Sequence, residues 1–481
     1  MRVSEHFQLD MRQPSLEFLD VNTEADLRLF VNAKAIRSLN TEWSRVCEEA
    51  ISTFFDSVIA AIRSGNDQVA LELLEELTEP NETHLGLSKG RSDGRGLGPE
   101  KALEIRNSLK RSRAVQTGLL TDLEDTVLLV GGVSVDIVSD IITNIIRGPL
   151  IEFTQQMCSN YGIQMSEGVA SGSIWNIDTR EWEHGYLHLP VIAGEKLILV
   201  PKEIVRLTSD YDVDAYYRHF VMRRLKSIEE MNNTHLVRII QTGKNKGQRR
   251  VNIKDLQEKF GTDKKRVCIE QTNNHPDLLA EYKAANSEPT PPLSHRQLLD
   301  AQGLEPTDWD RLIDEVVALE PGRQAAYKYE DKIQALLKAL FYPSLVQPET
   351  QTPLHDGLKR VDLTFKNHAS EGFFKWVSTH YRAPYVFVEC KNYGSEIGNP
   401  DIDQLAMRMS PARGMFGILV CRNIENFELM MQRCKAAAAD GHAYIVVLTD
   451  DDLGELVDAA KNPFKSQNYD LLQKRFQALV H

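Results

Sequence analysis

The sequence has few cysteines, and they carry no recognisable pattern. They are Cys47, Cys158, Cys268, Cys390, Cys421 and Cys434. No CxxC pair occurs, and no spacing is typical of a zinc site. The chain also lacks an uninterrupted apolar run of about 18 residues, which a membrane-spanning helix needs, and no apolar signal segment follows Met1. We therefore expect reduced thiols, no membrane span and a cytoplasmic protein.

An excess of positive charge is also missing. The net charge of −13 argues against a protein that coats nucleic acid through its overall charge, although a local basic groove stays compatible with it. Hydrophobic residues make up 42% and charged residues 26%, which is typical of folded globular proteins. A chain of 481 residues exceeds the usual size of a single core, so we expect two or three domains.

Helical periodicity dominates the first third of the chain. Apolar residues recur at helical spacing from Leu27 to Leu77, and the pattern continues to about Gly162. Short segments such as SIWNID and YLHLPVI are then typical of strands. We predict a helical N-terminal domain at residues 1–165 and a mixed α+β segment at residues 166–286, which can belong to the same domain.

A proline-rich segment separates this region from the C-terminal part. Residues 287–292 read SEPTPP, and successive prolines disfavour helix in the residues before them. We predict a linker at residues 287–323 and an α/β domain at residues 324–481. The segments YKYEDKIQALLKALF, KRVDLTF, YVFVECK and FGILVC read as a helix and three strands, with further helices and a strand, AYIVVL, following. This order favours a mixed sheet flanked by helices.

Two of these strands place charged residues at informative positions. In KRVDLTF, Asp362 alternates with apolar neighbours and is displayed on the opposite face from them. In YVFVECK, Glu389 and Lys391 share one face at the end of an apolar strand. If the strands are neighbours, Asp362 and Glu389 can bind Mg²⁺, because hard divalent cations need oxygen ligands. Lys391 then lies beside a metal-bound water.

This arrangement resembles the PD-(D/E)XK nuclease superfamily, in which an acid on one strand precedes (D/E)xK on the next. The resemblance covers roughly residues 324–448 and implies a restriction-endonuclease-like fold. It implies catalysis by Asp362, Glu389, Lys391 and Gln404, and metal ligation by Asp362, Glu389 and Glu330. It further implies hydrolysis of DNA phosphodiesters with Mg²⁺, which Mn²⁺ can replace, and leaves RNA as an alternative substrate. Val361 departs from the literal motif at a tolerant position.

The ExK triplet alone is weak evidence for a nuclease site, because the chain repeats it at Glu281 and again at Glu330. Two alternatives therefore stay open. The charged residues can form a surface ion-pair cluster at strand ends, which contributes little to stability, or the fold can have lost catalysis. We expect Glu389→Ala to abolish cutting and to leave folding nearly intact, because an exposed strand-end carboxylate contributes little to stability.

Several basic residues are candidates for nucleic-acid contacts. Arg408 follows Gln404 by one turn on a predicted helix, so we expect it to touch a phosphate, and Arg360 flanks Asp362. Lys89 and Arg91 lie in a glycine-rich loop, which can cover DNA or be an ordinary surface loop.

The sequence as a whole predicts a metal-dependent DNA endonuclease. By analogy of architecture, we expect antiviral defence in bacteria, with the N-terminal region sensing or targeting, a homodimer, and a partner defence protein as a further option. The alternatives are a DNA repair or recombination nuclease, and a nucleic-acid- or protein-binding module with an inactive nuclease fold.

Overall fold

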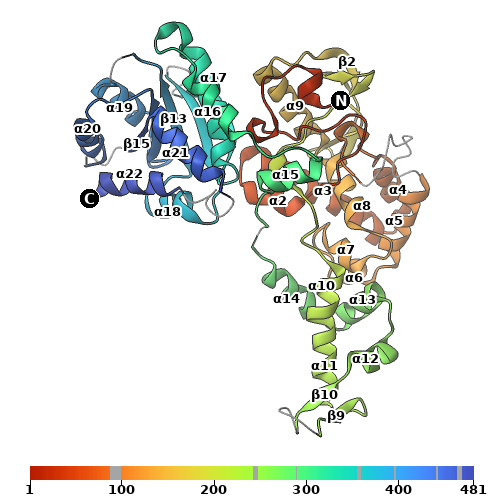
Figure 1. Cartoon of the computed structure of the whole chain (residues 1–481). Coiled ribbons are helices and arrows are strands. Elements are labelled where there is room, and N and C mark those ends of the chain that lie inside the picture. The colour runs from red at the N-terminus through yellow and green to blue at the C-terminus, as the bar shows by residue number, and fades with distance from the viewer. Residues whose placement is uncertain are drawn as a thin grey trace. The chain divides into compact units, whose positions relative to one another are not determined.

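A computed structural model of the protein describes residues 1–86, 99–241, 247–288, 290–354, 359–394, 397–439, 443–462 and 469–481. The chain divides into two compact units, whose elements are shown in Figure 1. Unit 1 comprises Met1–Phe7 and Val21–Thr290, and unit 2 comprises Gln8–Asp20 and Pro291–His481. Among the described residues, no helix combines the length and the apolar character that crossing a bilayer requires.

The first part of unit 1 is helical, as its periodicity predicts. Its elements are α1 (Val3–His6), β1 (Phe30–Val31), α2 (Ala33–Leu39), α3 (Glu42–Arg63), α4 (Asp67–Glu75), η2 (Asn81–Thr83), α5 (Pro99–Arg111), α6 (Arg113–Thr117), α7 (Asp125–Leu129), α8 (Val135–Ile145) and α9 (Arg147–Tyr161). The longest helix, α3, begins at a capping box in which Thr41 accepts from the Ser44 N–H. Its apolar stripe, including Phe54 and Val58, is buried in the unit.

The rest of unit 1 mixes short strands with helices. Its elements are β2 (Ser166–Ala170), β3 (Ile174–Asn176), β4 (Glu181–Glu183), β5 (Tyr186–Leu189), β6 (Val191–Ile192), β7 (Glu195–Lys196), η3 (Lys202–Ile204), β8 (Val205–Arg206), α10 (Val213–Tyr216), η4 (Tyr217–Val221), α11 (Met222–Met231), β9 (Val237–Ile239), β10 (Arg249–Val251), α12 (Ile253–Phe260), α13 (Lys264–Asn274) and α14 (Asp277–Ala285). The strands form two-stranded antiparallel pairs, of which β9 with β10 lies beyond the end of α11.

Unit 2 is an α/β unit built on one sheet. Its elements are η1 (Gln13–Ser15), α15 (His295–Gln302), α16 (Trp309–Val317), η5 (Arg323–Ala325), α17 (Ala326–Phe341), β11 (Leu345–Leu354), β12 (Lys359–Asn367), α18 (Gly372–His380), β13 (Tyr385–Lys391), α19 (Asn399–Ala406), β14 (Phe416–Cys421), α20 (Phe427–Ala439), β15 (Tyr444–Leu448), α21 (Asp450–Ala460) and α22 (Asp470–Val480). The predicted mixed sheet flanked by helices is confirmed.

The five strands lie in the order β11-β12-β13-β14-β15. The first three form an antiparallel meander, whereas β13, β14 and β15 are parallel. Each parallel step is made through a helix, α19 and then α20, because parallel neighbours need a crossover connection. The change from antiparallel to parallel pairing therefore occurs at β13, the strand that carries Glu389 and Lys391.

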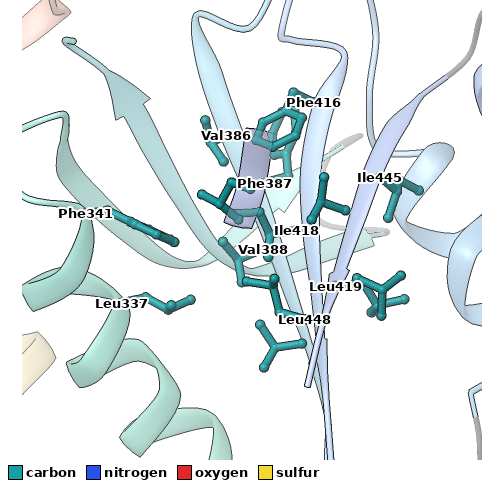
Figure 2. Close-up of a cluster of buried hydrophobic side chains, with 14 of the residues drawn as sticks. Leu337, Phe341, Val386, Phe387, Val388, Phe416, Ile418, Leu419, Ile445 and Leu448 are labelled. Carbon is teal, nitrogen blue, oxygen red and sulfur yellow. The ribbon is translucent and has the colours of Figure 1, made fainter. Parts of the chain in front are cut away.

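Apolar side chains on both faces of the sheet form the core of unit 2. Figure 2 shows Leu337 and Phe341 of α17 near Val388 of β13, and Ile418 and Ile445 on the neighbouring strands. All five are buried. Strands covered on both faces read as nearly continuous apolar runs, and FGILVC and AYIVVL do so. The core fixes the strand ends from which the charged residues project.

The segment at residues 287–323 differs from the predicted bare linker. It contains α15 and α16, and Val316 of α16 is buried in the same apolar cluster as α17. The prolines of SEPTPP mark only the start of this segment, because α15 begins at a separate capping box made by Ser294 and Gln297. The boundary between the units falls between Thr290 and Pro291.

Candidate active site

Asp362 lies where strands β12 and β13 cease to pair. The paired positions end at Leu363 opposite Val388, although β13 continues beside β14 as far as Lys391. Beyond that last pair, the main-chain N–H of Cys390 donates to Asp362 Oδ2 over 2.8 Å. The carboxylate thus takes the place of a main-chain acceptor and holds the ends of the two strands together.

Glu389 and Lys391 lie on the same sheet face as Asp362, since Leu363 and Val388 share the other face and side chains alternate along a strand. Lys391 Nζ donates to Glu389 Oε1 over 2.9 Å and to Gln404 Oε1, on α19, over 3.2 Å. Gln404 itself is exposed. Strands β12 and β13 and helix α19 therefore bring together the four predicted catalytic residues, which are Asp362, Glu389, Lys391 and Gln404.

Arg408 does not lie on the surface, although its predicted contact with phosphate requires an exposed side chain. Helix α19 ends at Ala406, earlier than expected, and the turn that follows directs the arginine inward. Its guanidinium donates to Glu389 Oε2, and the residue is only 6% exposed. The structure thus places Arg408 against a buried carboxylate and not on an exposed helix face, and its contact with phosphate stays a prediction.

Glu389 is also buried, which corrects the expectation of an exposed strand-end carboxylate. It is 2% exposed, and its two oxygens accept from Lys391 and Arg408. The physical reason is the close approach of α19 to the sheet. A Cβ atom added at Gly417 on β14 would lie 3.3 Å from Leu405 Cδ2 of α19. The ion pair between Glu389 and Arg408 is therefore buried, whereas Asp362 and Lys391 beside it are half-buried.

Burial sets the electrostatics of this network. It raises the pKa of the Asp362 carboxyl above its ordinary value, while the Cys390 N–H and the charges of Lys391 and Arg408 act in the opposite direction. It also lowers the pKa of the Arg408 guanidinium. The pKa of the Cys390 thiol is raised by burial and by the charges of Asp362 and Glu330. These effects favour the neutral thiol over the thiolate.

Glu330 is connected to the network through a neighbour. Gln334, one turn further along α17, donates to Glu330 Oε1 over 3.1 Å and to the main-chain oxygen of Asp362 over 3.3 Å. Across the described residues, no group of three or more His, Cys, Asp or Glu side chains has the arrangement of a metal site. Metal ligation by Glu330 stays a prediction.

Sequence reasoning missed Gln334. The signal was available, because Gln334 follows Glu330 by four residues on the same helical face. Three other predicted nucleic-acid contacts lie wholly or partly outside the described residues. Lys89 and Arg91 lie outside the described residues, and the side chain of Arg360 lies outside them although its main chain belongs to β12.

The comparisons with known proteins concern the other end of the chain. No curated protein matches the chain, and no solved structure matches it. Residues 8–212 match a family described as a domain of unknown function (DUF8370).

Proposed function

We propose that unit 2 is a metal-dependent nuclease with a restriction-endonuclease-like fold, which hydrolyses phosphodiester bonds of DNA. One observation carries the proposal. Residues that the superfamily resemblance singles out lie on four elements, and two sets of hydrogen bonds, connected by the main chain of β13, join them. The first set runs from Glu330 through Gln334 to Asp362 and the Cys390 main chain, and the second joins Glu389, Lys391 and Gln404. An unrelated surface cluster has no reason to connect these particular residues.

The two acidic side chains offer the type of ligand atom that a divalent cation binds. Asp362 and Glu389 are carboxylates, the hard oxygen ligands that Mg²⁺ prefers, and they would hold the ion. When bound, Mg²⁺ lowers the pKa of a coordinated water and polarises the phosphate. Both Glu389 oxygens already accept from cations, however. Metal binding therefore competes with Arg408 and Lys391 for this carboxylate.

The chain's own residues have distinct tasks in this proposal. Hydrolysis adds a water oxygen to phosphorus and breaks one phosphorus–oxygen ester bond, and the leaving oxygen takes up a proton. The ammonium of Lys391 places a positive charge where negative charge develops on the phosphate. Gln404 positions that ammonium through its side-chain oxygen. Asp362 fixes the strand end that carries both Glu389 and Lys391.

The test is cleavage of plasmid DNA by the purified chain with Mg²⁺, with Mn²⁺ and with a chelator. We expect cutting with either metal, none with the chelator, and a loss of about 10²-fold or more in Lys391→Ala. Lys375→Ala removes an exposed lysine on α18 and is the matched control. A Lys391→Ala protein that is folded and cuts at the wild-type rate contradicts the site assignment.

The ion pair between Arg408 and Glu389 favours a second candidate function. In this alternative, the network is structural and unit 2 is a nucleic-acid- or protein-binding module without catalysis. Arginine then replaces a metal as the permanent partner of the buried carboxylate. Absence of cutting with both metals, together with retained DNA binding, favours this second candidate over the nuclease.

We place the nuclease in bacterial antiviral defence, with unit 1 sensing or targeting and with a homodimer cutting both strands. Repair or recombination of DNA is the alternative setting. Expression of the wild-type chain in bacteria should reduce phage plating, and Lys391→Ala should abolish that protection. Equal protection by both proteins contradicts a defence role that depends on cutting.

A further inference from the structure

One part of unit 1 has a charge opposite to that of the whole chain. The stretch from residue 217 to residue 266 contains, in its described residues 217–241 and 247–266, twelve Lys and Arg against five Asp and Glu, whereas the chain has a net charge of −13. This stretch comprises η4, α11, the β9–β10 pair, α12 and the start of α13. We call it the basic arm. A local excess of seven positive charges among the described residues of an acidic protein indicates a surface for a polyanion.

The acidic residues of the basic arm are largely engaged within it. Glu229 pairs with Lys259 over 2.5 Å, and Asp255 pairs with Arg238 over 3.0 Å. Asp263 caps the N-terminus of α13. These contacts engage three of the five acids of the arm, and its cations outnumber all five.

That surplus is exposed. Arg223, Arg249, Arg250 and Lys254 are all exposed, and among the described residues none of them has a carboxylate within 4.0 Å. Arg249 donates only to the main-chain oxygen of Glu230, over 3.3 Å. Cations without acidic partners are available for phosphate oxygens.

The arm lacks a surface on which unpaired bases can stack. Residues 217–266 contain no Trp and only three Phe or Tyr residues, none of them exposed. Tyr217 is buried, and Phe220 and Phe260 are half-buried, the latter with Lys259 Nζ 5.1 Å from its ring centre. Proteins that bind single strands combine basic grooves with exposed aromatic side chains. The basic arm therefore fits the phosphate backbone of a duplex better than a single strand.

Helix α13 is not placed to read bases. It follows α12 after residues 261–263, and Gly261 has a φ of 105°, as in a helix-turn-helix turn. The first lysines of α13 are held by unit 1 itself: Lys264 Nζ lies 2.6 Å from Asp214 Oδ1, and Lys265 Nζ donates to the main-chain oxygen of Val133 over 2.6 Å. The available cations lie instead on α11, β10 and α12.

We propose that the basic arm binds the phosphate backbone of double-stranded nucleic acid without sequence preference. This inference goes beyond the proposed function, because it concerns unit 1 and holds even if unit 2 does not cut. It predicts similar affinity for duplexes of different sequence and a steep dependence on salt.

The experiment measures fluorescence anisotropy of a labelled 30-bp duplex with the full chain, in chelator, between 50 and 200 mM salt. The variant combines Arg249→Ala, Arg250→Ala and Lys254→Ala. We expect its affinity to fall by about tenfold or more, and the slope of log affinity against log salt to become shallower by about three. Chelator prevents metal-dependent cutting, so failure of binding is distinguishable from failure of the nuclease proposal.

The matched control removes three exposed lysines of unit 2, as Lys375→Ala, Lys435→Ala and Lys474→Ala. It changes the net charge equally and should bind the duplex like the wild type. Equal losses in both variants, or none in the arm variant, overturn the proposal. Binding of phosphatidylserine-rich vesicles as tightly as the duplex also overturns the proposal. That result assigns the arm to membranes, into which the exposed Ile239 and Ile253 would insert. Thermal unfolding by circular dichroism checks that each variant is folded.

Discussion

At the scale of single residues, the two cations that contact Glu389 determine how much its replacement lowers the free energy of unfolding. A surface carboxylate contributes little to stability, but this one is buried with Arg408. Removing one partner of a buried ion pair leaves the other as an uncompensated charge in a low-dielectric interior. The structure therefore reverses the expectation that Glu389 can be replaced without effect on folding.

We predict that Glu389→Ala lowers the free energy of unfolding of unit 2 by about 3–5 kcal/mol. The double variant Glu389→Leu with Arg408→Met should lose less, because it leaves no buried charge without a partner. Hydrogen exchange of β13 and β14 peptides in increasing urea measures both changes. A loss below about 1 kcal/mol in Glu389→Ala would show that Arg408 reaches water.

A second residue-scale effect concerns Asp140 on α8. Burial and the nearby carboxylates of Asp136, Glu79 and Asp26 raise the pKa of Asp140 from 3.8 to about 8. The folded state therefore holds a proton that the unfolded state releases above about pH 4. The resulting stabilisation is complete below pH 4 and is lost as the pH rises through 8.

We predict that unit 1 becomes less stable as the pH rises from about 4 to 8, and that Asp140→Asn flattens this dependence. At pH 8 the variant should be more stable than the wild type, because it carries no buried negative charge. Urea unfolding at a series of pH values tests this. Asp178→Asn removes an exposed carboxylate and should keep the wild-type profile; an Asp140→Asn profile as steep as the wild type refutes the assignment.

At the scale of elements, the position of α19 decides whether the charged residues form a network. The helix supplies Gln404, and the turn after it supplies Arg408. Its approach to β14 depends on Gly417, where an added Cβ would collide with Met409 Cε and would lie 3.2 Å from the main-chain oxygen of Phe387 and 3.3 Å from Leu405 Cδ2. A methyl group at this position would therefore force Met409 and its other neighbours to shift.

We predict that Gly417→Ala destabilises unit 2 by about 1–3 kcal/mol and displaces α19. Duplex cutting should fall as well if the proposed site is active, since Gln404 moves with the helix. Gly454→Ala on α21 is the control, because a Cβ there meets nothing within 4 Å and alanine favours helix. Thermal unfolding compares the two variants, and equal melting temperatures would count against the close-packing account.

At the scale of the whole molecule, the two units are not consecutive stretches of the sequence, and positive charge is not spread evenly along the chain. Residues Gln8–Asp20 belong to unit 2, although unit 1 lies on both sides of them in the sequence. Glu17 pairs with Lys338 of α17 over 2.8 Å, and both side chains are buried. Positive charge is likewise concentrated in the basic arm of unit 1, whereas the whole chain is acidic.

The sequence by itself determined the helices of unit 1, the strands of the mixed sheet, and the grouping of Asp362, Glu389 and Lys391 on one face. Each depends on periodicity or alternation within a few residues, so neighbouring side chains carry the information. Only the tertiary structure decided that Glu389 is buried, that Arg408 turns inward, and that Gln8–Asp20 packs with unit 2. These features depend on contacts between residues far apart in the chain, which no local pattern records.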